Sequence, residues 1–227
     1  MARGIFITGT DTGVGKTHVS TLLVTQLVEQ GLRVAVMKPI ASGAGFHKLQ
    51  WQNDDALQLM QVANVKHNYE LVNPYCFEPA IAPHLAAQQA NVTIQLDMIH
   101  ECYAQLAANS DIVIVEGAGG WAVPLNEQQY FYDLVLRLKL DVVLVVGLRL
   151  GCLNHALLTA DHIASKGAKL LGWIANHIEP QMAFAEQNIQ TLQQRIPAPL
   201  LAILPFQNDD NHFLNKNISF FSDIIKT

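Results

Sequence analysis

The stretch that decides the fold is Gly9-Thr-Asp-Thr-Gly-Val-Gly15-Lys16-Thr17, which directly follows the apolar run Ile5-Phe6-Ile7. Glycines in such a loop let consecutive backbone N–H groups turn inward around phosphate oxygens, and the following helix N-terminus adds a favourable dipole. Lys16 can reach the β- and γ-phosphates, and the Thr17 hydroxyl can ligate Mg²⁺. In the usual spacing, GxxxxGK[ST], a glycine would stand at Thr10, whereas here Gly9 lies one residue earlier. The stretch predicts a loop that binds nucleotide phosphates.

Outward from this loop, short apolar runs alternate with helical patterns. A helix is predicted from 17 to 30 with Gly31 as its C-terminal cap. Further strands are predicted at 33–37, 111–116, 141–147, 170–175 and 200–204. The apolar runs are near-continuous, as in strands buried on both faces of a parallel sheet. This alternation predicts an α/β fold, a doubly wound, mostly parallel sheet flanked by helices, in a single domain covering 1–227. The segment 41–53 is the least periodic and is expected to be a loop.

Composition limits the possible classes of function. The chain has 227 residues, of which 50% are hydrophobic and 15% charged, so a globular domain with a buried core is expected. The net charge of −5 gives no electrostatic reason to expect nucleic-acid binding. Three cysteines without a CxxC pair indicate reduced thiols rather than a disulfide framework or a zinc site. With neither a signal-peptide pattern nor a membrane-length apolar run, a cytoplasmic protein is expected.

A second element of a nucleotide site is predicted at 111–116. This apolar strand ends in Glu116, which would place a carboxylate beside the magnesium of the phosphate loop. The turn Gly117-Ala-Gly-Gly120 follows and permits close approach of the backbone to a ligand. Taken alone, the pattern is equally consistent with an acidic strand end and a flexible turn. Together with the phosphate loop it favours a metal ligand.

Three other polar positions are candidates for the same site. Lys38 ends the predicted strand 33–37, and Ser42 follows in a loop. A lysine at a strand end is usually solvated, but the carboxyl edge of the sheet favours an electrostatic role for Lys38. Asp54 and Asp55 open the next helical pattern, where N-capping is the simpler interpretation and completion of a magnesium shell the alternative.

The remaining motifs have simpler interpretations. His155 and His162 fall on one predicted helix without a metal-ligand spacing and are interpreted, with His18, as structural or surface residues. The apolar positions in 214–225 predict a helix that packs on the core of this protein. A membrane-binding helix is the alternative, and only two lysines support it.

Taken in order, these motifs resemble those of the dethiobiotin synthetase family. The resemblance is carried by GTDTGVGKT at 9–17, KPIASG at 38–43, NDDAL at 53–57, NPYCFEPAIAPH at 73–84, VEGAGGW at 115–121, LGCLNHALLTA at 150–160, GWIANHIEP at 172–180 and IPAPLLAILP at 196–205. It spans nearly the whole chain. It implies an ATP- and Mg²⁺-dependent cyclo-ligase of biotin biosynthesis. Such an enzyme carboxylates an amine of 7,8-diaminononanoate with CO₂ or bicarbonate, phosphorylates the carbamate, and closes a cyclic urea as phosphate leaves.

The resemblance also implies roles for individual residues. Lys16 and Lys38 would be catalytic and would flank the transferred phosphoryl group, and Thr17, Asp55 and Glu116 would be the magnesium ligands. The substrate would contact Thr12, Ser42, Leu150, Gly151, Cys152 and Asn154, the last four across the interface of a homodimer. The nucleotide would contact Gly13, Val14, Gly15, Lys16, Thr17, His18, Asp55, Glu116, Gly117, Ala118, Gly119, Asn176, His177, Pro205, Phe206 and Gln207. Among these, Asn176 would read adenine, and residues 205–207 would line the base. Gly13 and His177 stand where some members carry acidic residues.

Two other classes compete with this interpretation. A partitioning or regulatory ATPase shares the fold and a related loop, but typically carries an additional lysine early in the loop, and residues 9–15 contain none. A cobyrinate-type amide synthase would need a glutamine-hydrolysing domain, for which the chain has no room. The cyclo-ligase is therefore the expected function.

Overall fold

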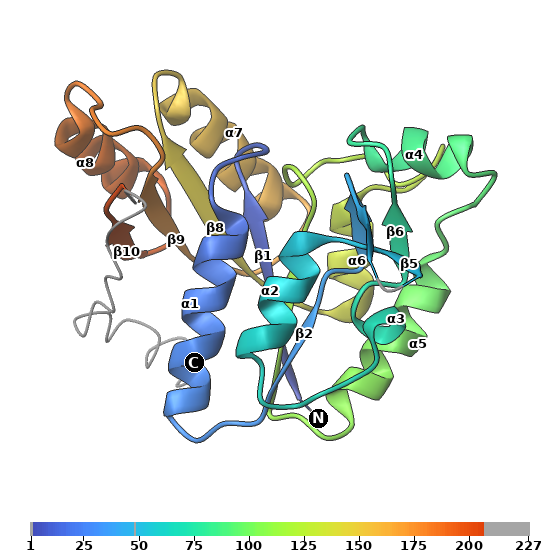
Figure 1. The fold of residues 1–227 in the computed structure, drawn as a ribbon. Coiled ribbons are helices and arrows are strands. Elements are labelled where there is room, and N and C mark those ends of the chain that lie inside the picture. Colours follow the sequence, from blue (N-terminus) through green and yellow to red (C-terminus); the bar gives the residue numbers. More distant parts are fainter. Residues whose placement is uncertain (1, 48, 207–227) are drawn as a thin grey trace.

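The structure is a computed structural model that describes residues 2–47 and 49–206. Its central feature is a parallel sheet with the strand order β10–β9–β8–β1–β7–β2 (Figure 1). Its strands are β1 (Arg3–Gly9), β2 (Val34–Met37), β7 (Ile112–Glu116), β8 (Asp141–Leu148), β9 (Leu170–His177) and β10 (Leu200–Leu204). All neighbouring pairs are parallel. The predicted α/β class and each predicted strand are confirmed. The helix expected in 214–225 lies outside the described residues.

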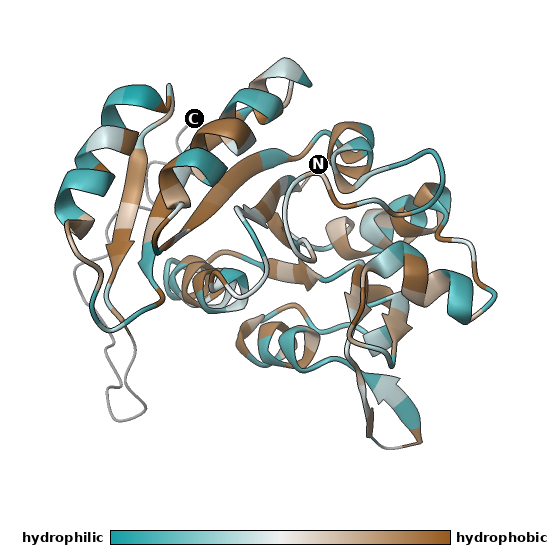
Figure 2. Cartoon of the chain, turned by 90° about the horizontal axis from the view of Figure 1, so that it is seen from above, coloured by the Kyte–Doolittle hydropathy of each residue, from teal (hydrophilic) through white to brown (hydrophobic). Residues whose placement is uncertain are grey.

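Helices pack against this sheet and against one another. The described helices are α1 (Lys16–Glu29), α2 (Asp54–Val62), α3 (Tyr69–Val72), α4 (Pro83–Gln89), α5 (Leu96–Ala107), α6 (Phe131–Leu138), α7 (Cys152–Ser165) and α8 (Ala185–Arg195). α1 and α2 lie side by side over β1, β2 and β7, while α7 packs on β8 and β9 beside α8 (Figure 1). Seen from above, the sheet is mostly brown and the helices alternate between brown and teal (Figure 2). Helices that pack on the sheet, such as α1, α2, α5 and α7, therefore turn apolar side chains toward it.

The core explains the near-continuous apolar runs. Ile5, Phe6 and Ile7 of β1 are fully buried, and so are the middle residues of β7 and β8. A second apolar cluster surrounds Trp173 and lies between β8 and β9 on one side and α7 and α8 on the other. Burying each large side chain contributes about 1.5–3 kcal/mol. Strands covered on both faces cannot alternate polar and apolar residues, which is why they read as continuous runs.

The segment 41–53 differs from its prediction as a loop. It contains the end of β3 (Ile40–Ser42), which pairs in parallel with β6 (Tyr75–Phe77), and the hairpin of β4 (Gly45–His47) and β5 (Gln50–Gln52). The rings of Phe46 and Trp51 meet edge to face across the hairpin, 5.3 Å apart. Strands of three residues are too short to show a sequence period, so the prediction was wrong here.

The ends of two helices bear on the predicted site. α1 ends at Gln30, and Gly31 follows with a φ of 83°, so the predicted glycine cap is confirmed. α2 is capped by Asn53, whose side chain accepts from the backbone N–H of Ala56 at 3.3 Å. Capping by Asp54 or Asp55 was therefore wrong. Both carboxylates lie in the first turn instead, which leaves the side chain of Asp55 available for other partners.

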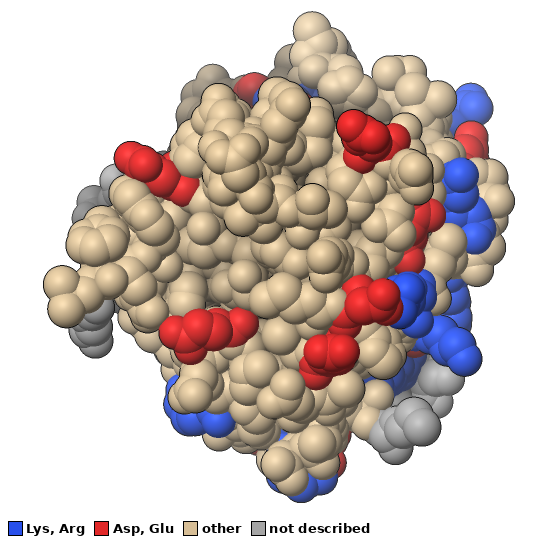
Figure 3. All heavy atoms as spheres, turned by 90° about the vertical axis from the view of Figure 1, so that its right-hand side faces the viewer, with Lys and Arg blue, Asp and Glu red and all other residues tan. Residues whose placement is uncertain are grey.

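The described residues show neither a membrane-spanning helix nor, on the face viewed in Figure 3, a concentration of basic groups. No described helix combines the length and the apolar character that crossing a membrane requires. On the face shown in Figure 3, acidic groups are scattered among uncharged atoms, and lysine and arginine atoms lie mainly toward its margin. This view agrees with the small negative net charge of the chain.

Candidate active site

The parallel register brings three strand ends together. Ile7 of β1 lies beside Glu116 of β7, and Met37 of β2 lies beside Val115 of the same strand. Lys38, which follows β2, is therefore level with Glu116, and the loop after β1 lies next to both. Ligands of open α/β sheets bind at this carboxyl edge. The sheet thus assembles a site from segments far apart in sequence.

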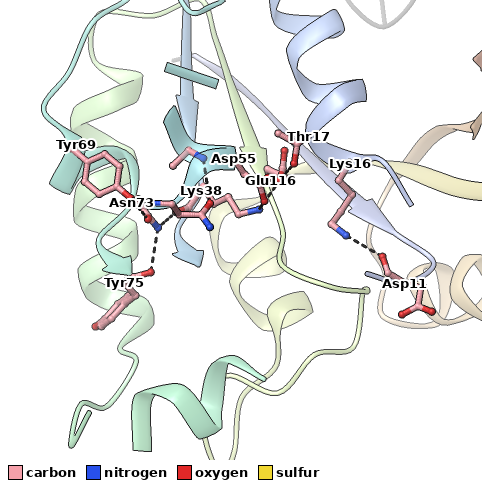
Figure 4. A network of polar contacts seen from close by, with 11 residues as sticks. Asp11, Lys16, Thr17, Lys38, Asp55, Tyr69, Asn73, Tyr75 and Glu116 are labelled. Atoms are coloured by element: carbon pink, nitrogen blue, oxygen red, sulfur yellow. Dashed lines mark hydrogen bonds and ion pairs between the residues drawn. The ribbon is translucent and has the colours of Figure 1, made fainter. Parts of the chain in front are cut away.

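The loop between β1 and α1 has the backbone shape of a phosphate-binding turn. Gly13 and Gly15 have φ values of 73° and 88°, which favour glycine because other residues are strained there. A Cβ on Gly15 would lie 2.2 Å from Asn176 Nδ2, so a side chain there would also clash. The ammonium group of Lys16 donates to the backbone oxygen of Asp11 at 3.0 Å (Figure 4).

Lys38 lies between two carboxylates (Figure 4). Its Nζ is 2.6 Å from Asp55 Oδ2 and 2.6 Å from Glu116 Oε1. The Thr17 hydroxyl donates to the same Glu116 oxygen at 2.9 Å. Lys38 is 4% exposed and Glu116 is fully buried, so these charges interact with little screening. The four side chains form one cluster at the carboxyl edge of the sheet.

The charges in this cluster determine its protonation. Burial alone would lower the pKa of Lys38, but the carboxylates of Glu116 and Asp55 outweigh it and raise that pKa. Burial would likewise raise the pKa of Asp55, but the Lys38 charge lowers it. Burial and the nearby positive charge of Lys38 lower the pKa of Lys16 to about 8. Lys38 is therefore firmly charged in the free protein, whereas Lys16 titrates just above neutral pH.

The cluster has the donors that Mg²⁺ requires in a nucleotide site. Oxygens of Asp55, Glu116 and Thr17 converge, and Glu116 Oε2 is buried without a hydrogen-bond partner among the described residues. The described residues contain no group of three or more histidine, cysteine or acidic side chains that could hold a metal by themselves. Two carboxylates and a hydroxyl are suitable ligands for Mg²⁺, because this ion usually completes its coordination with water molecules and phosphate oxygens.

A cavity of about 680 Å³ opens at this edge. Of the predicted site residues, it is lined by Thr12, Gly13, Gly15, Lys16, Thr17, Lys38, Ser42, Asp55, Ala118 and Gly119. Its lining also includes Asn53 and residues 80–83, which were not predicted. Val14 and Glu116 do not line the cavity. Both side chains are buried, and Glu116 belongs to the ion-pair cluster with Lys38. Gly117 packs so closely on Phe6 that a Cβ would lie 2.7 Å from its ring.

Of the residues predicted around the nucleotide base, Asn176 contacts the phosphate loop. Asn176 is the last residue but one of β9, is 5% exposed, and donates to the backbone oxygen of Val14 at 2.9 Å. Leu204 of β10 pairs with Asn176, so Pro205 and Phe206 follow at the same edge, and both are exposed. His177 and His18 are half-buried, and burial lowers the pKa of His18. Gln207 lies outside the described residues. Of these residues, none that the structure describes lines the cavity.

The predicted segment 150–154 is not part of the cavity either. Leu150 is 98% exposed, Gly151 caps α7 with a φ of 93°, and Asn154 is exposed. The Cys152 side chain is buried in the core under α7, and its backbone N–H donates to Arg149 O at 3.0 Å. Cys152 therefore offers neither its thiol nor its N–H to a ligand in this arrangement. Arg149, which was not predicted, pairs with Asp11 and connects this segment to the phosphate loop.

Together, the parallel sheet, the glycine loop and the lysine–carboxylate cluster define a P-loop nucleotide-binding protein. Comparison with known proteins narrows this class. A family model described as an AAA domain matches residues 3–211. The curated relatives include ATP-dependent dethiobiotin synthetase BioD of Pseudoalteromonas translucida (strain TAC 125), 48% identical over 205 residues that cover 90% of each chain. BioD of Nitrosospira multiformis (strain ATCC 25196 / NCIMB 11849 / C 71) is 47% identical over 212 residues, covering 93% of this chain and 91% of the relative.

The chain belongs to the ATP-dependent dethiobiotin synthetase family. The family expected from the sequence is confirmed, and with it an ATP- and Mg²⁺-dependent ligase that forms carbon–nitrogen bonds. The relatives are matched along almost their whole length, as expected from motifs spread from 9 to 205.

Solved structures of other proteins show the same fold. The septum site-determining protein MinD with Mg-ADP from Pyrococcus horikoshii OT3 has a TM-score of 0.55 and 17% identity, covering 91% of this chain and 82% of that chain. A ParA family ATPase from Chlorobium tepidum TLS has a TM-score of 0.57 and 14% identity, covering 92% and 87%. At these identities the likeness extends to the fold alone. The partitioning-ATPase alternative is therefore not favoured over the synthetase relatives.

Proposed function

We propose that this chain converts 7,8-diaminononanoate and CO₂ into dethiobiotin, with cleavage of ATP to ADP and phosphate. One observation carries this proposal beyond family membership. Lys38 and Lys16 lie at one cavity with Asp55 and Thr17, as transfer of a phosphoryl group to a bound carbamate requires. Phosphoryl transfer depends on positioning and charge neutralisation more than on covalent chemistry by the protein.

The proposed reaction divides the cavity between two substrates. The loop from Gly13 to Thr17 holds the ATP phosphates. Thr12, which comes directly before Gly13 in the same loop, and Ser42 hold the carbamate end of the diamine. Lys16 and Lys38 stabilise the negative charge that develops on the transferred group. The second amine then attacks the carbamic–phosphoric anhydride, phosphate leaves, and the cyclic urea closes within one bound molecule.

Thr17, Asp55 and Glu116 are the proposed magnesium ligands, and Mg²⁺ would supply charge neutralisation and orientation of the phosphates. In the free protein the Lys38 ammonium group neutralises the same two carboxylates. With these carboxylates neutralised by Mg²⁺, Lys38 would be free to contact the transferred phosphoryl group. On the base side, we assign adenine recognition to Asn176, with His177, Pro205, Phe206 and Gln207 around the base. His18 and the turn 117–119 complete the nucleotide contacts.

We further propose a homodimer in which the start of α7 receives the substrate carboxylate from the partner subunit. The exposed Leu150, Gly151 and Asn154 support this, because an accessible helix N-terminus is suited to a carboxylate. Cys152 would contribute only through the shape of its backbone, since its thiol is buried.

Mixing two inactive variants tests the shared site. Lys38→Met and Asn154→Ala subunits, combined in equal amounts, should recover up to about a quarter of the wild-type activity by statistical pairing in a symmetric dimer. The reason is that half of the dimers are mixed, and each mixed dimer retains one intact site. Activity that stays at background although mass measurement shows mixed dimers would rule out a site shared in this way.

The chain as a whole is proposed to be one cytoplasmic domain, 1–227. One large apolar cluster runs through the described sheet and its helices, and Cys76, Cys102 and Cys152 are free thiols, which suits a reducing compartment. Its partners are then small molecules, with neither nucleic acid nor membrane among them. More than one unfolding transition, or recovery outside the cytoplasmic fraction of the cell, would contradict these assignments.

The activity itself is tested by phosphate release from MgATP, with and without 7,8-diaminononanoate and bicarbonate, combined with mass analysis of the product. We expect release that depends on the diamine, and a product heavier than the diamine by one carbonyl unit in place of two hydrogens. A rate of ATP hydrolysis that is unchanged by the diamine but is stimulated by a protein partner, DNA or a membrane would support a regulatory ATPase instead.

A further inference from the structure

A buried network of hydrogen bonds reaches the backbone of Lys38 from α3 and the residue that follows it, Asn73 (Figure 4). The Tyr69 hydroxyl donates to Asn73 Oδ1 at 2.7 Å. The Asn73 amide donates to the main-chain oxygen of Lys38 at 2.6 Å and to that of Tyr75 at 3.2 Å. Tyr69 is 8% exposed and Asn73 is 3% exposed, and neither lines the cavity. The network therefore acts on Lys38 through its backbone and not through its ammonium group.

The same tyrosine reaches the other side of the ion pair. Its hydroxyl accepts from the backbone N–H of Asn53 at 2.7 Å. Asn53 is the N-cap of α2, and Asp55 lies in the first turn of that helix. The Tyr69 hydroxyl is thus bonded both to the start of the helix that carries Asp55 and, through Asn73, to the strand end that carries Lys38.

Main-chain bonds hold the segment 69–73 in place. The Lys38 N–H donates to Val72 O at 2.8 Å, and the Asn73 N–H donates to Tyr69 O at 2.7 Å. Breaking one member of a buried network leaves its partners unsatisfied, so the arrangement resists displacement. The Lys38–Asp55 contact of 2.6 Å is therefore determined by residues outside the cavity.

We propose that Tyr69 and Asn73 are positioning residues that fix Lys38 and Asp55 relative to each other, and thereby set both the metal requirement and the rate of phosphoryl transfer. The inference rests on the proposed function, in which Lys38 stabilises the transferred group and Asp55 ligates Mg²⁺. Displacing a reacting group by about 1 Å can cost a factor of about 10² in rate. A shift of the end of β2 relative to the start of α2 would therefore change both the stabilisation of the transferred group by Lys38 and the binding of Mg²⁺ by Asp55.

Tyr69→Phe tests this directly, because it removes only the hydroxyl that joins the two arms. We expect kcat to fall about tenfold or more, and the Mg²⁺ concentration for half-maximal activity to rise severalfold, while the KM for the diamine changes little. The matched control is Tyr75→Phe. Tyr75 is also buried, at 6% exposure, and its hydroxyl accepts from the Gln95 N–H at 2.9 Å, away from Lys38 and Asp55. It should lose thermal stability without changing kcat or the Mg²⁺ requirement.

Asn73→Asp is the second variant and serves if Tyr69→Phe folds poorly. Aspartate has the shape of asparagine but cannot donate to Lys38 O when ionised. It should show the same paired change in kcat and Mg²⁺ requirement. Unchanged values of both quantities in the variants, or equal losses in Tyr75→Phe, would overturn the inference.

A readout without the diamine separates this inference from the proposed function. Calorimetry measures how strongly Mg²⁺ enhances the binding of ADP. We expect this enhancement to be smaller in Tyr69→Phe than in the wild type, and unchanged in Tyr75→Phe. If the wild type shows no turnover with the diamine but Tyr69→Phe still weakens this enhancement, the proposed function fails and the positioning role stands. If turnover is present and the metal dependence is the same in all three proteins, the positioning role fails alone.

Discussion

Lys38→Met is expected to lower kcat by a factor of about 10²–10³ while MgATP still binds, because the variant lacks a cation that stabilises the transferred phosphoryl group. Lys38 is 4% exposed and within 2.6 Å of both Asp55 and Glu116, so its loss also leaves two carboxylates without their cation. Removing one partner of a buried ion pair costs about 3–5 kcal/mol. In the absence of metal the variant should therefore be much less stable than the wild type.

Mg²⁺ should recover part of that stability, since the metal supplies positive charge at the same carboxylates. The measurement is the free energy of unfolding in denaturant, with excess chelator and with Mg²⁺, alongside single-turnover kinetics. Lys169→Met is the matched control, because Lys169 is exposed, and it should match the wild type in both measurements. A Lys38→Met protein with normal turnover would contradict the catalytic role. A Lys38→Met protein whose free energy of unfolding is not raised by Mg²⁺ would contradict the proposal that the lysine and the metal neutralise the same carboxylates.

Glu116→Gln is expected to raise the Mg²⁺ concentration for half-maximal activity at least tenfold, which corresponds to about 1.4 kcal/mol. Glutamine keeps the size of the side chain but removes the negative charge that faces Lys38 at 2.6 Å and the Thr17 hydroxyl at 2.9 Å. Glu116 is fully buried, so solvent screens its charge little and the loss of that charge acts fully on the site.

A magnesium titration of activity at saturating ATP measures this effect. Asp54→Asn is the control of matched charge, because Asp54 is exposed in the first turn of α2 beside Asp55 and does not line the cavity. Its titration should overlay that of the wild type. An unchanged titration for Glu116→Gln would remove Glu116 from the ligand set, and a shift in Asp54→Asn would show that net charge near the site is sufficient.

Much of the fold was predictable because its signals are local. The strands of the main sheet are apolar runs that need no partner to be recognised, and the cap at Gly31 depends on one backbone conformation. The hairpin of β4 and β5 was missed because three-residue strands carry no period. The cap of α2 was assigned to the wrong residue, since Asn53, Asp54 and Asp55 are all favourable capping types and only the backbone geometry distinguishes them.

The residues of the site were predictable as types, but not as an arrangement. Lys16 and Thr17 follow from the spacing of the glycine loop, and Glu116 from the end of its strand. Asn73 opens the block 73–84 that carries part of the resemblance, but nothing in the sequence places it or Tyr69 behind Lys38, because a buried tyrosine and a turn asparagine occur in most folds. The pairing of Arg149 with Asp11, 138 residues apart in the chain, could likewise not be predicted from the sequence.

The sequence by itself determined the fold class, the phosphate loop and the chemical groups available, because strand burial, helix period and glycine spacing act over a few residues. Only the tertiary structure decided that Lys38 lies between Asp55, 17 residues away, and Glu116, 78 residues away. Only the structure showed that Asn53 is the N-cap of α2 and that Tyr69 bonds to this cap. The physical reason is that Coulomb and hydrogen-bond energies depend on separation in space. The parallel register of β2 and β7 brings Lys38 level with Glu116, and the bonds of Tyr69 and Asn73 connect Lys38 to the start of α2, which carries Asp55.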